Sequence, residues 1–309
     1  MMSAGRYAPS PSGDLHLGNL RTALLSWLFA ASTGRPLLLR FEDLDAGRTI
    51  PGSAERQFKD LRAIGITFSG EPLWQSQRQR HYGAAVGQLR EAGLVYECFC
   101  TRREIQDAPR APHAPPGAYP GTCRDLGDAE RRQRRRQRPP ALRLKAEAGE
   151  YRVADLLLGE VTGLVDDLVL VRNDGTAAYN LAVVVDDHLT GVDQVVRGDD
   201  LASSTPRQVY LRGLLYGQRA AESVQYAHVP LVLNRQGQRL AKRDGAVTLG
   251  QLSELGRSPE QVRDELLASL GLPRGPLEQS VKTFDPSRLP KQPWVFSPAS
   301  QKRGPSESI

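Results

Sequence analysis

A lone histidine stands where a loop rich in proline, serine and glycine gives way to an apolar run, in PSPSGDLHLGNL, residues 9–20. His16 lies two residues before Gly18, and Asn19 follows. A helix N-terminus presents unpaired backbone N–H groups and the positive end of the helix dipole, and glycine lets a phosphate approach the backbone. A histidine there can donate a hydrogen bond to that phosphate. The segment therefore predicts nucleotide binding; the alternative is a turn and helix cap in which His16 is incidental.

A second polar segment, residues 234–249, reads NRQGQRLAKRDGAVTL and carries a basic cluster between its glycines. Lys242 has small and basic neighbours and little to pack against. An ammonium on a mobile loop can meet the charge that develops on departing pyrophosphate, so the segment suits a triphosphate clamp. The alternative is a solvated basic loop without a ligand.

All three cysteines of the chain, Cys98, Cys100 and Cys123, fall within one short stretch. An odd number does not suit a disulfide framework, and the cytosol is reducing. Three thiolates need one further ligand to complete a tetrahedral zinc shell, and the imidazole of His113 is the chemical favourite. The stretch therefore predicts one structural zinc site, which would hold an otherwise irregular loop.

Alternating strands and helices must position these groups over the first 95 residues. The sequence predicts strands at 6–8 and 36–43, and helices at 17–32, 53–65 and 77–93. The leucines at 17, 20, 24 and 28 follow helical spacing and indicate one core-facing stripe. Strand and helix in alternation favour a parallel α/β sheet.

The middle of the chain changes character and resembles an insertion. Residues 107–125 are rich in proline and glycine, and the basic run ERRQRRRQR occupies 130–138. Beyond this insertion the sequence predicts strands at 168–172, 181–185 and 195–197, a tight turn at Asn173–Gly175 and a helix at 204–216. Further on, Ser258 can cap a helix that has Pro259 in its first turn.

Composition is ordinary for a globular protein, with 309 residues, 39% hydrophobic and 25% charged. The length suits one large or two modest domains. The formal net charge of +6 is compatible with a nucleic-acid partner without establishing one. The longest apolar stretch, residues 23–31, is too short to span a bilayer, and the N-terminus lacks the pattern of a secretory signal. We therefore expect a cytoplasmic protein with no membrane partner.

Six linked motifs together resemble the glutamyl branch of the class I aminoacyl-tRNA synthetases, over about residues 6–250. APSPSGDLHLGN is similar to the first signature of that class, and RLAKR to its lysine-containing second signature. RFEDLD, AYNLAVVVDDHLTGV, VVRGDDLASSTPRQ and AHVPLVLNRQGQRLAK resemble the branch in order and spacing. The sequence departs from the signatures at Asn19, where histidine is usual, and at Ala241, where serine is common.

This resemblance implies an α/β fold, a Rossmann-like class I catalytic domain interrupted by a zinc-containing subdomain. Its two halves would be 1–95 and 166–245, with the insertion at 96–165. A short helical unit at 246–275 and a flexible tail at 276–309 would follow.

Too few residues remain after Arg243 for the anticodon-binding region of a full-length glutamyl-tRNA synthetase. The pattern instead resembles the stand-alone members of the branch. These activate L-glutamate with ATP in the absence of tRNA and attach it to queuosine at the wobble position of tRNA(Asp). Two alternatives are a truncated enzyme that charges the 3′ end of tRNA(Glu), and a non-catalytic tRNA- or nucleotide-binding relic. We expect a monomer.

The resemblance also assigns residues. It implies that His16, Gly18, Asn19 and Lys242 bind ATP, with catalytic roles for His16, Asn19 and Lys242 and with Mg²⁺ held mainly by the phosphates. It implies a glutamate site made of Arg6, Ser10, Glu42, Tyr179 and Arg197. Glu42 suits the ammonium and the arginines suit the carboxylates, although which arginine takes which carboxylate is open. For zinc, the family pattern adds Tyr119, rather than His113, to Cys98, Cys100 and Cys123. The run at 130–138 is either an exposed helix face or a tRNA contact.

Overall fold

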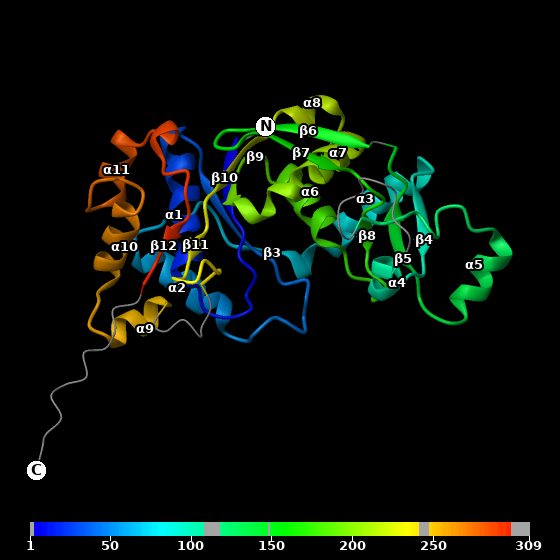
Figure 1. The fold of residues 1–309 in the computed structure, drawn as a ribbon, viewed down its shortest axis with the longest axis horizontal. Helices are drawn as coiled ribbons and strands as arrows, with labels where there is room; N and C mark the ends of the chain where they lie inside the picture. The colour runs from blue at the N-terminus through cyan, green and yellow to red at the C-terminus, as the bar shows by residue number, and fades with distance from the viewer. Residues whose placement is uncertain (1–2, 108–117, 148, 241–246, 298–309) are drawn as a thin grey trace, which may run out of the picture.

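A seven-stranded sheet forms the centre of the computed structural model, which describes residues 3–107, 118–147, 149–240 and 247–297 (Figure 1). The strand order is β3-β2-β1-β9-β10-β6-β7, and every neighbouring pair is parallel except the β6–β7 hairpin. The strands are β1 (Ala4–Tyr7), β2 (Leu37–Phe41), β3 (Leu73–Trp74), β6 (Glu150–Asp155), β7 (Gly159–Leu164), β9 (Val192–Gly198) and β10 (Gln225–Val229). The predicted parallel α/β sheet is confirmed.

Helices cover both faces of this sheet because the buried side chains of its strands alternate. On β9, Val195 packs in one cluster with Val209 of α7, whereas Val196 packs with the leucines of α1. The helices of this part are α1 (Leu17–Ser32), α2 (Ser53–Ala63), α3 (Gln79–Glu91), α6 (Tyr179–Leu189), α7 (Thr205–Tyr216) and α8 (Gln218–Glu222), with short 3₁₀ turns at Gln75–Arg78 and Asp199–Ser204. Within the described residues, no helix combines the length and apolar character needed to cross a membrane.

The predicted helices at 17–32, 53–65, 77–93 and 204–216 are confirmed, but the predicted strand at 181–185 is wrong. Residues 181–185 form the interior of helix α6. All five side chains are buried, so this short apolar run carries no alternation that separates a buried strand from a buried helix. The turn at 173–175 is confirmed, with Gly175 at φ +83° and its N–H donating to the Arg172 carbonyl at 3.0 Å.

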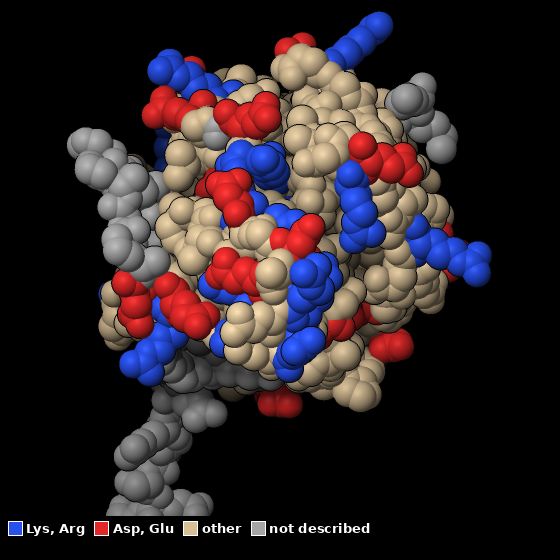
Figure 2. Space-filling model, turned by 90° about the vertical axis from the view of Figure 1, so that its right-hand side faces the viewer, with Lys and Arg blue, Asp and Glu red and all other residues tan. Residues whose placement is uncertain are grey.

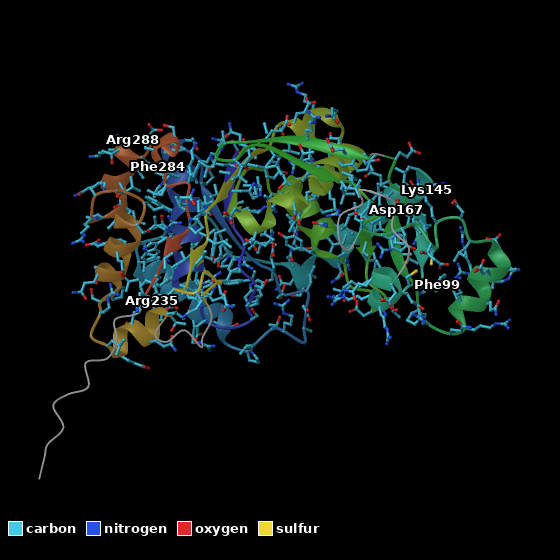
Figure 3. The ribbon with its side chains drawn as sticks, viewed as in Figure 1. Phe99, Lys145, Asp167, Arg235, Phe284 and Arg288 are labelled. Atoms are coloured by element: carbon cyan, nitrogen blue, oxygen red, sulfur yellow. The ribbon has the colours of Figure 1, made fainter. Side chains whose placement is uncertain are left out.

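The inserted subdomain is a separate three-stranded antiparallel sheet, at the right of Figure 1. It consists of β4 (Val95–Cys98), β5 (Ala141–Leu144) and β8 (Val169–Val171), with helices α4 (Arg102–Asp107) and α5 (Asp128–Arg135). Its predicted boundary at 165 is wrong in detail: the hairpin β6–β7 belongs to the central sheet, and β8 belongs to the insertion. Figure 3 labels Phe99, Lys145 and Asp167 in this half of the molecule.

The C-terminal part continues beyond the predicted helical unit. Helix α10 (Pro259–Ala268) begins as predicted, because Ser258 accepts a hydrogen bond from the Gln261 N–H and Pro259 stands in the first turn. The predicted flexible tail from 276 is wrong for residues 276–297: Leu277 and Phe296 are buried in the main core, at the end of the molecule where Figure 3 labels Phe284. The elements here are α9 (Leu249–Glu254), α11 (Leu277–Thr283), a 3₁₀ turn at Pro286–Arg288, and the pair β11 (Val232–Leu233) and β12 (Trp294–Val295).

Candidate functional site

A cavity of about 640 Å³ opens where the parallel strands β1, β2 and β9 end. The carboxyl edge of an open parallel sheet is where ligands bind in α/β folds. The structure brings together at this cavity all the predicted glutamate and nucleotide residues that it describes, namely Arg6, Ser10, His16, Gly18, Asn19, Glu42, Tyr179 and Arg197.

Strand periodicity explains why charged side chains gather on one face of this edge. Alternate residues of a strand lie on the same face. Arg6 stands two residues after the buried Ala4, and Arg197 two residues after the buried Val195, so both arginines lie on the face that α7 covers. On β10, Tyr226 and His228 are also two residues apart and share one face. The register pairs Arg197 directly with His228.

His16 caps helix α1, and the cap bonds order its imidazole, while its role in nucleotide binding stays a prediction. Its Nδ1 accepts hydrogen bonds from the backbone N–H groups of Gly18 at 3.1 Å and Asn19 at 3.3 Å. Burial, assisted by the positive charge of Arg239, lowers the pKa of His16 to about 4. The imidazole is therefore neutral near pH 7 with its proton on Nε2, which leaves one N–H donor for a ligand in the cavity.

Replacing His16 by Asn should remove a pH dependence of stability. The folded-state pKa of about 4 lies below the ordinary 6.5, so neutral His16 stabilises the fold above pH 6.5, and this contribution is lost as the pH falls toward 4. Over that window the wild type should lose up to about 3 kcal/mol relative to His16→Asn, since Asn also caps helices well but does not titrate. Urea unfolding of both proteins between pH 4 and 8 measures this; parallel curves would refute it.

Gly18 and Asn19 complete the start of α1. A Cβ on Gly18 would stand 2.9 Å from His16 Cε1 and 3.0 Å from its Nδ1, so a larger residue would displace the imidazole. Asn19 Oδ1 accepts from the His16 backbone N–H at 3.2 Å, which closes a capping box. The residue that departs from the family signature thus has a defined role at the helix terminus.

Lys242 lies outside the described residues, but Leu240 lines the cavity and Val247 contacts the start of α1. The Leu17 N–H at the start of α1 donates to the Val247 carbonyl at 2.9 Å. Arg239 also lines the cavity and forms an ion pair with Asp200. Arg239 and Leu240, the first two residues of the lysine signature, therefore lie at the same cavity as His16.

Arg6 and Glu42 form another wall of the cavity, and Arg40 and Asp187 form ion pairs with them. Arg6 is 4% exposed, and its Nε lies 3.6 Å from Asp187 Oδ1 of α6. Arg40 donates to the same oxygen at 2.5 Å and to Glu42 Oε1 at 3.3 Å. Burial would raise the pKa of Asp187, but Arg40 and Arg6 outweigh it and the pKa is lowered. An ionised Asp187 thus holds both guanidinium groups in place.

Glu42 has a different balance. Burial raises its pKa, and the opposing effects of Arg40 and Arg6 are too small to reverse the shift. A cation entering the cavity would favour the ionised form of Glu42 and so oppose this shift. This is the behaviour of a carboxylate that completes its pairing only with a ligand.

Sequence reasoning missed the acidic pair that supports this wall. Asp186 is fully buried and accepts hydrogen bonds from Gln75 at 2.8 Å, Arg78 at 2.5 Å and Tyr82 at 2.8 Å. Together with Asp187 it follows an apolar run, and two acids there are the available sequence signal of buried charge partners.

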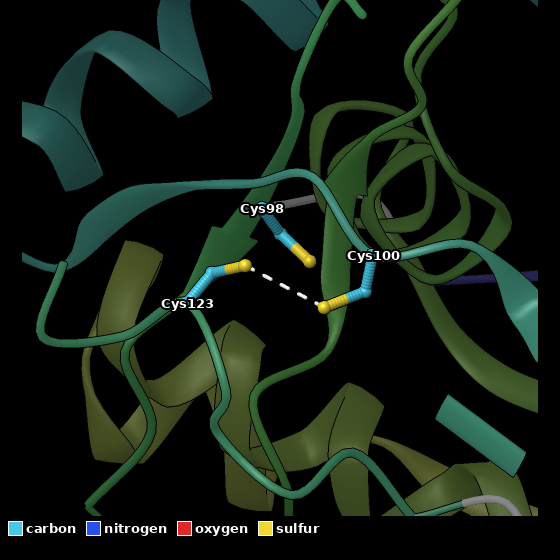
Figure 4. A group of neighbouring side chains, drawn as sticks. All are labelled: Cys98, Cys100 and Cys123. Carbon is cyan, nitrogen blue, oxygen red and sulfur yellow. Dashed lines mark hydrogen bonds between the residues drawn. The ribbon is translucent and has the colours of Figure 1, made fainter. Parts of the chain in front are cut away.

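The three cysteines meet in the inserted subdomain, as predicted (Figure 4). Their Sγ atoms all lie within 4.8 Å of one another, with 3.5 Å between those of Cys100 and Cys123. All three are free thiols. Sulfur atoms at this spacing are close enough to ligate one metal ion.

Tyr119 is the fourth member of this cluster. Its hydroxyl oxygen lies 3.3 Å from Cys98 Sγ and 3.7 Å from Cys100 Sγ, and it accepts from the Cys123 N–H at 2.9 Å. The Arg143 guanidinium stacks 3.7 Å above its ring, and burial raises the pKa of the Tyr119 hydroxyl. Burial raises the pKa of the Cys100 thiol to about 12, so a cation would be needed to ionise that thiol. His113 lies outside the described residues.

Residues 130–135 of the arginine run at 130–138 lie in α5. Four arginines of the run form ion pairs with acidic side chains. Figure 2 shows the adjoining face, where Lys and Arg are interspersed with Asp and Glu and form no continuous basic patch. The ion pairs are Arg131–Asp128, Arg134–Glu130, Arg135–Glu97 and Arg138–Glu104. This is the pattern of a solvated helix face, and the tRNA contact stays a prediction.

Comparison with known proteins identifies the family of this chain. Residues 4–296 match the family described as tRNA synthetases class I (E and Q), catalytic domain. A protein named glutamyl-Q tRNA(Asp) synthetase from Nocardia farcinica is 63% identical over 95% of this chain and 93% of its own length. Another of that name from Cutibacterium acnes is 50% identical over 88% of this chain and 77% of its own. A crystal structure of a glutamate tRNA ligase from Elizabethkingia meningosepticum is 27% identical, with a TM-score of 0.80, over 96% of this chain and 67% of that one.

Proposed function

Since the chain belongs to the class I tRNA synthetases of the glutamate and glutamine type, within the group named glutamyl-Q tRNA(Asp) synthetases, we propose a function on that premise. The protein attaches glutamate to queuosine in tRNA(Asp). It is a ligase of this family. The observation that carries the proposal is the single cavity that the helix-capping imidazole, two arginines and Glu42 share.

In the first step, a carboxylate oxygen of glutamate attacks the α-phosphate of ATP, and glutamyl adenylate and pyrophosphate form. Arg6 and Arg197 would hold the carboxylates, Glu42 the ammonium, and Ser10 and Tyr179 would supply neutral hydrogen-bonding groups. His16 Nε2–H, the α1 N-terminus at Gly18 and Asn19, and Lys242 would hold the phosphates. No covalent enzyme intermediate is needed, because positioning and charge stabilisation suffice.

In the second step, a hydroxyl of the queuosine cyclopentene ring attacks the carbonyl carbon of the adenylate, and AMP leaves. Mg²⁺ would accompany ATP, coordinated mainly by phosphate oxygens. Zinc would be structural, held by Cys98, Cys100, Cys123 and Tyr119 outside the cavity; thiolate ligands suit it. We propose a cytoplasmic monomer, since ATP and tRNA are cytoplasmic substrates.

Glutamylation of purified tRNA(Asp), with and without queuosine, tests the proposal. We expect glutamate-dependent ATP–pyrophosphate exchange without any tRNA, and transfer of glutamate only to the tRNA that carries queuosine. Transfer to tRNA(Glu) alone would indicate an enzyme that charges the 3′ end. No exchange by well-folded protein would indicate a non-catalytic relic.

A further inference from the structure

All five N–H groups of the buried Arg197 guanidinium face an acceptor, but the five distances fall into two groups. Three bonds are short and run to side chains that are themselves buried, with exposed fractions of 2% or less. These acceptors are Gln208 at 2.9 Å, Thr205 at 2.9 Å and His228 at 3.1 Å. The two long bonds run to the Tyr179 hydroxyl at 3.5 Å and the Leu201 carbonyl at 3.4 Å, and both residues line the cavity.

This division separates a support from a binding face. The short bonds fix the plane of the guanidinium from behind. The long bonds use one N–H of Nη1 and one of Nη2, and bonds near 3.5 Å are weak. A carboxylate in the cavity would take over these two N–H groups as a bidentate partner. The Nε–H group of Arg197 donates to His228 Nε2 at 3.1 Å.

The hydrogen bonds of His228 fix its tautomer. Because Nε2 accepts from Arg197, the imidazole proton must lie on Nδ1, which stands 2.6 Å from Asp155 Oδ2 at the end of β6. His228 and Asp155 side chains are both fully buried. His228 thus links the Asp155 carboxylate to the Arg197 guanidinium. The Thr205 hydroxyl also lies 3.1 Å from Nε2, and an N–H on Nε2 would face the Arg197 N–H.

The His228 side chain and three backbone N–H groups surround the Asp155 carboxylate. Its Oδ1 accepts from the N–H groups of Leu157 and Leu158, each at 2.9 Å, and its Oδ2 accepts from the backbone N–H of His228 at 3.1 Å. Burial raises the pKa of Asp155, but the bonds from His228, Leu158 and Leu157 outweigh it and the pKa is lowered. The two leucine N–H groups thus fix Oδ1 and the His228 imidazole fixes Oδ2, while the His228 backbone N–H lies within reach of both oxygens.

We propose that Asp155 and His228 are positioning residues that orient Arg197 toward a carboxylate of the substrate glutamate, an inference that rests on the proposed function. Neither touches the substrate. Asp155 acts from the β6–β7 hairpin, 73 positions before His228 in sequence, and His228 transmits its orientation to the arginine. Such indirect supports set the orientation of binding groups in the same way as partners behind metal ligands.

Asp155→Asn is the sharpest test, because the amide can be accommodated in only one orientation. Its oxygen must stay with the Leu157 and Leu158 N–H groups, where the His228 backbone N–H also reaches it at 3.3 Å, and this places the NH₂ group against His228 Nδ1. His228 then becomes an acceptor at Nδ1 and carries its proton on Nε2. There the new N–H faces Arg197 Nε–H and can be accepted by the Thr205 hydroxyl oxygen at 3.1 Å, so the bond from Arg197 is lost. We expect the KM for glutamate in pyrophosphate exchange to rise at least about tenfold, as loss of a hydrogen bond to a charged group requires, with the KM for ATP unchanged.

Two substitutions of His228 test the same link independently of Asp155. His228→Gln places an amide oxygen near the position of Nε2 and can still accept from Arg197, whereas His228→Asn reaches only the position of Nδ1. The glutamate KM should therefore stay lower in His228→Gln than in His228→Asn. Val195→Ala is the matched control: it loosens buried packing on the same face of β9 and should lower the melting temperature without changing the glutamate KM.

Equal changes in the two KM values, or equal values for the Gln and Asn variants, would overturn the positioning role and leave a purely structural network. Glutamate binding to the same variants by calorimetry needs neither ATP nor tRNA. Weaker glutamate binding by Asp155→Asn therefore supports the positioning role even if the protein does not transfer glutamate to tRNA. If the wild type transfers glutamate to tRNA and Asp155→Asn binds glutamate as tightly as the wild type, the positioning role is refuted while the proposed function stands.

Discussion

Replacing Glu42 by Gln should raise the KM for glutamate about 100-fold, because an amide cannot neutralise the ammonium in a buried site. Loss of one partner from a buried charge pair corresponds to about 3 kcal/mol. The KM for ATP should be unchanged within about twofold, since Glu42 is not among the groups proposed to hold the phosphates. Pyrophosphate exchange with each substrate varied in turn measures both constants.

The neighbouring carboxylate provides the control. Asp43 binds the backbone N–H and hydroxyl of Ser76, at 2.8 Å and 2.6 Å, and is not among the cavity residues. Asp43→Asn should therefore leave the glutamate KM unchanged. An equal loss in both variants, or an equal rise in the KM for ATP, would contradict the role of Glu42.

The pH dependence of binding follows from the same residue. Only ionised Glu42 attracts the ammonium, and burial raises its pKa above the ordinary 4.5. The glutamate KM of the wild type should therefore increase on acidification, from a pH above the range of an exposed carboxyl group. Glu42→Gln should show no such increase, because its side chain does not titrate.

Cys123→Ser should abolish metal binding, from about one zinc ion per chain to none, because a fully buried thiolate is lost from the ligand set. The inserted subdomain should loosen, since structural zinc in small folds contributes about 10 kcal/mol or more. Adenylate formation should survive better than transfer to tRNA, because the cysteines do not line the cavity. Metal analysis and pyrophosphate exchange on the same preparation separate the two effects.

Two matched tyrosine substitutions identify the fourth ligand. Tyr119→Phe removes the oxygen that lies 3.3 Å from Cys98 Sγ and should weaken zinc retention. Tyr96→Phe removes a hydroxyl from the same buried cluster, but that hydroxyl bonds Asp167 at 2.7 Å, so zinc should be retained. His113→Ala should also retain zinc. Zinc lost from the His113 variant and kept by Tyr119→Phe would overturn the assignment.

Several features were predictable because their signals are local. The cap at His16, the α1 stripe of leucines, and Ser258 with Pro259 each depend on residues within about one or two helical turns. The spacing of Cys98 and Cys100 likewise puts two thiols beside each other whatever the rest of the fold does. The family signatures add the order of the cavity residues along the chain.

Longer-range relations depend on the sheet, because strand order and register decide which distant side chains meet. The apolar run at 181–185 forms part of a helix. All five of its side chains are buried, so its sequence lacks the alternation that would distinguish a buried strand from a buried helix. Leu277 and Phe296 are ordered because they complete the core around α1, which the weak periodicity of the C-terminal residues does not reveal.

The sequence alone therefore determines the reactive groups and the elements that carry them: His16 on its helix terminus, Arg197 in its strand and the three clustered thiols. The tertiary structure decides what stands behind those groups. Asp187 pairs with Arg6, and Asp155 reaches Arg197 through His228, only because α6 packs on the sheet and β6 lies beside β10. These contacts require burial of charge, which is favourable only where a partner from another element is fixed at hydrogen-bond distance.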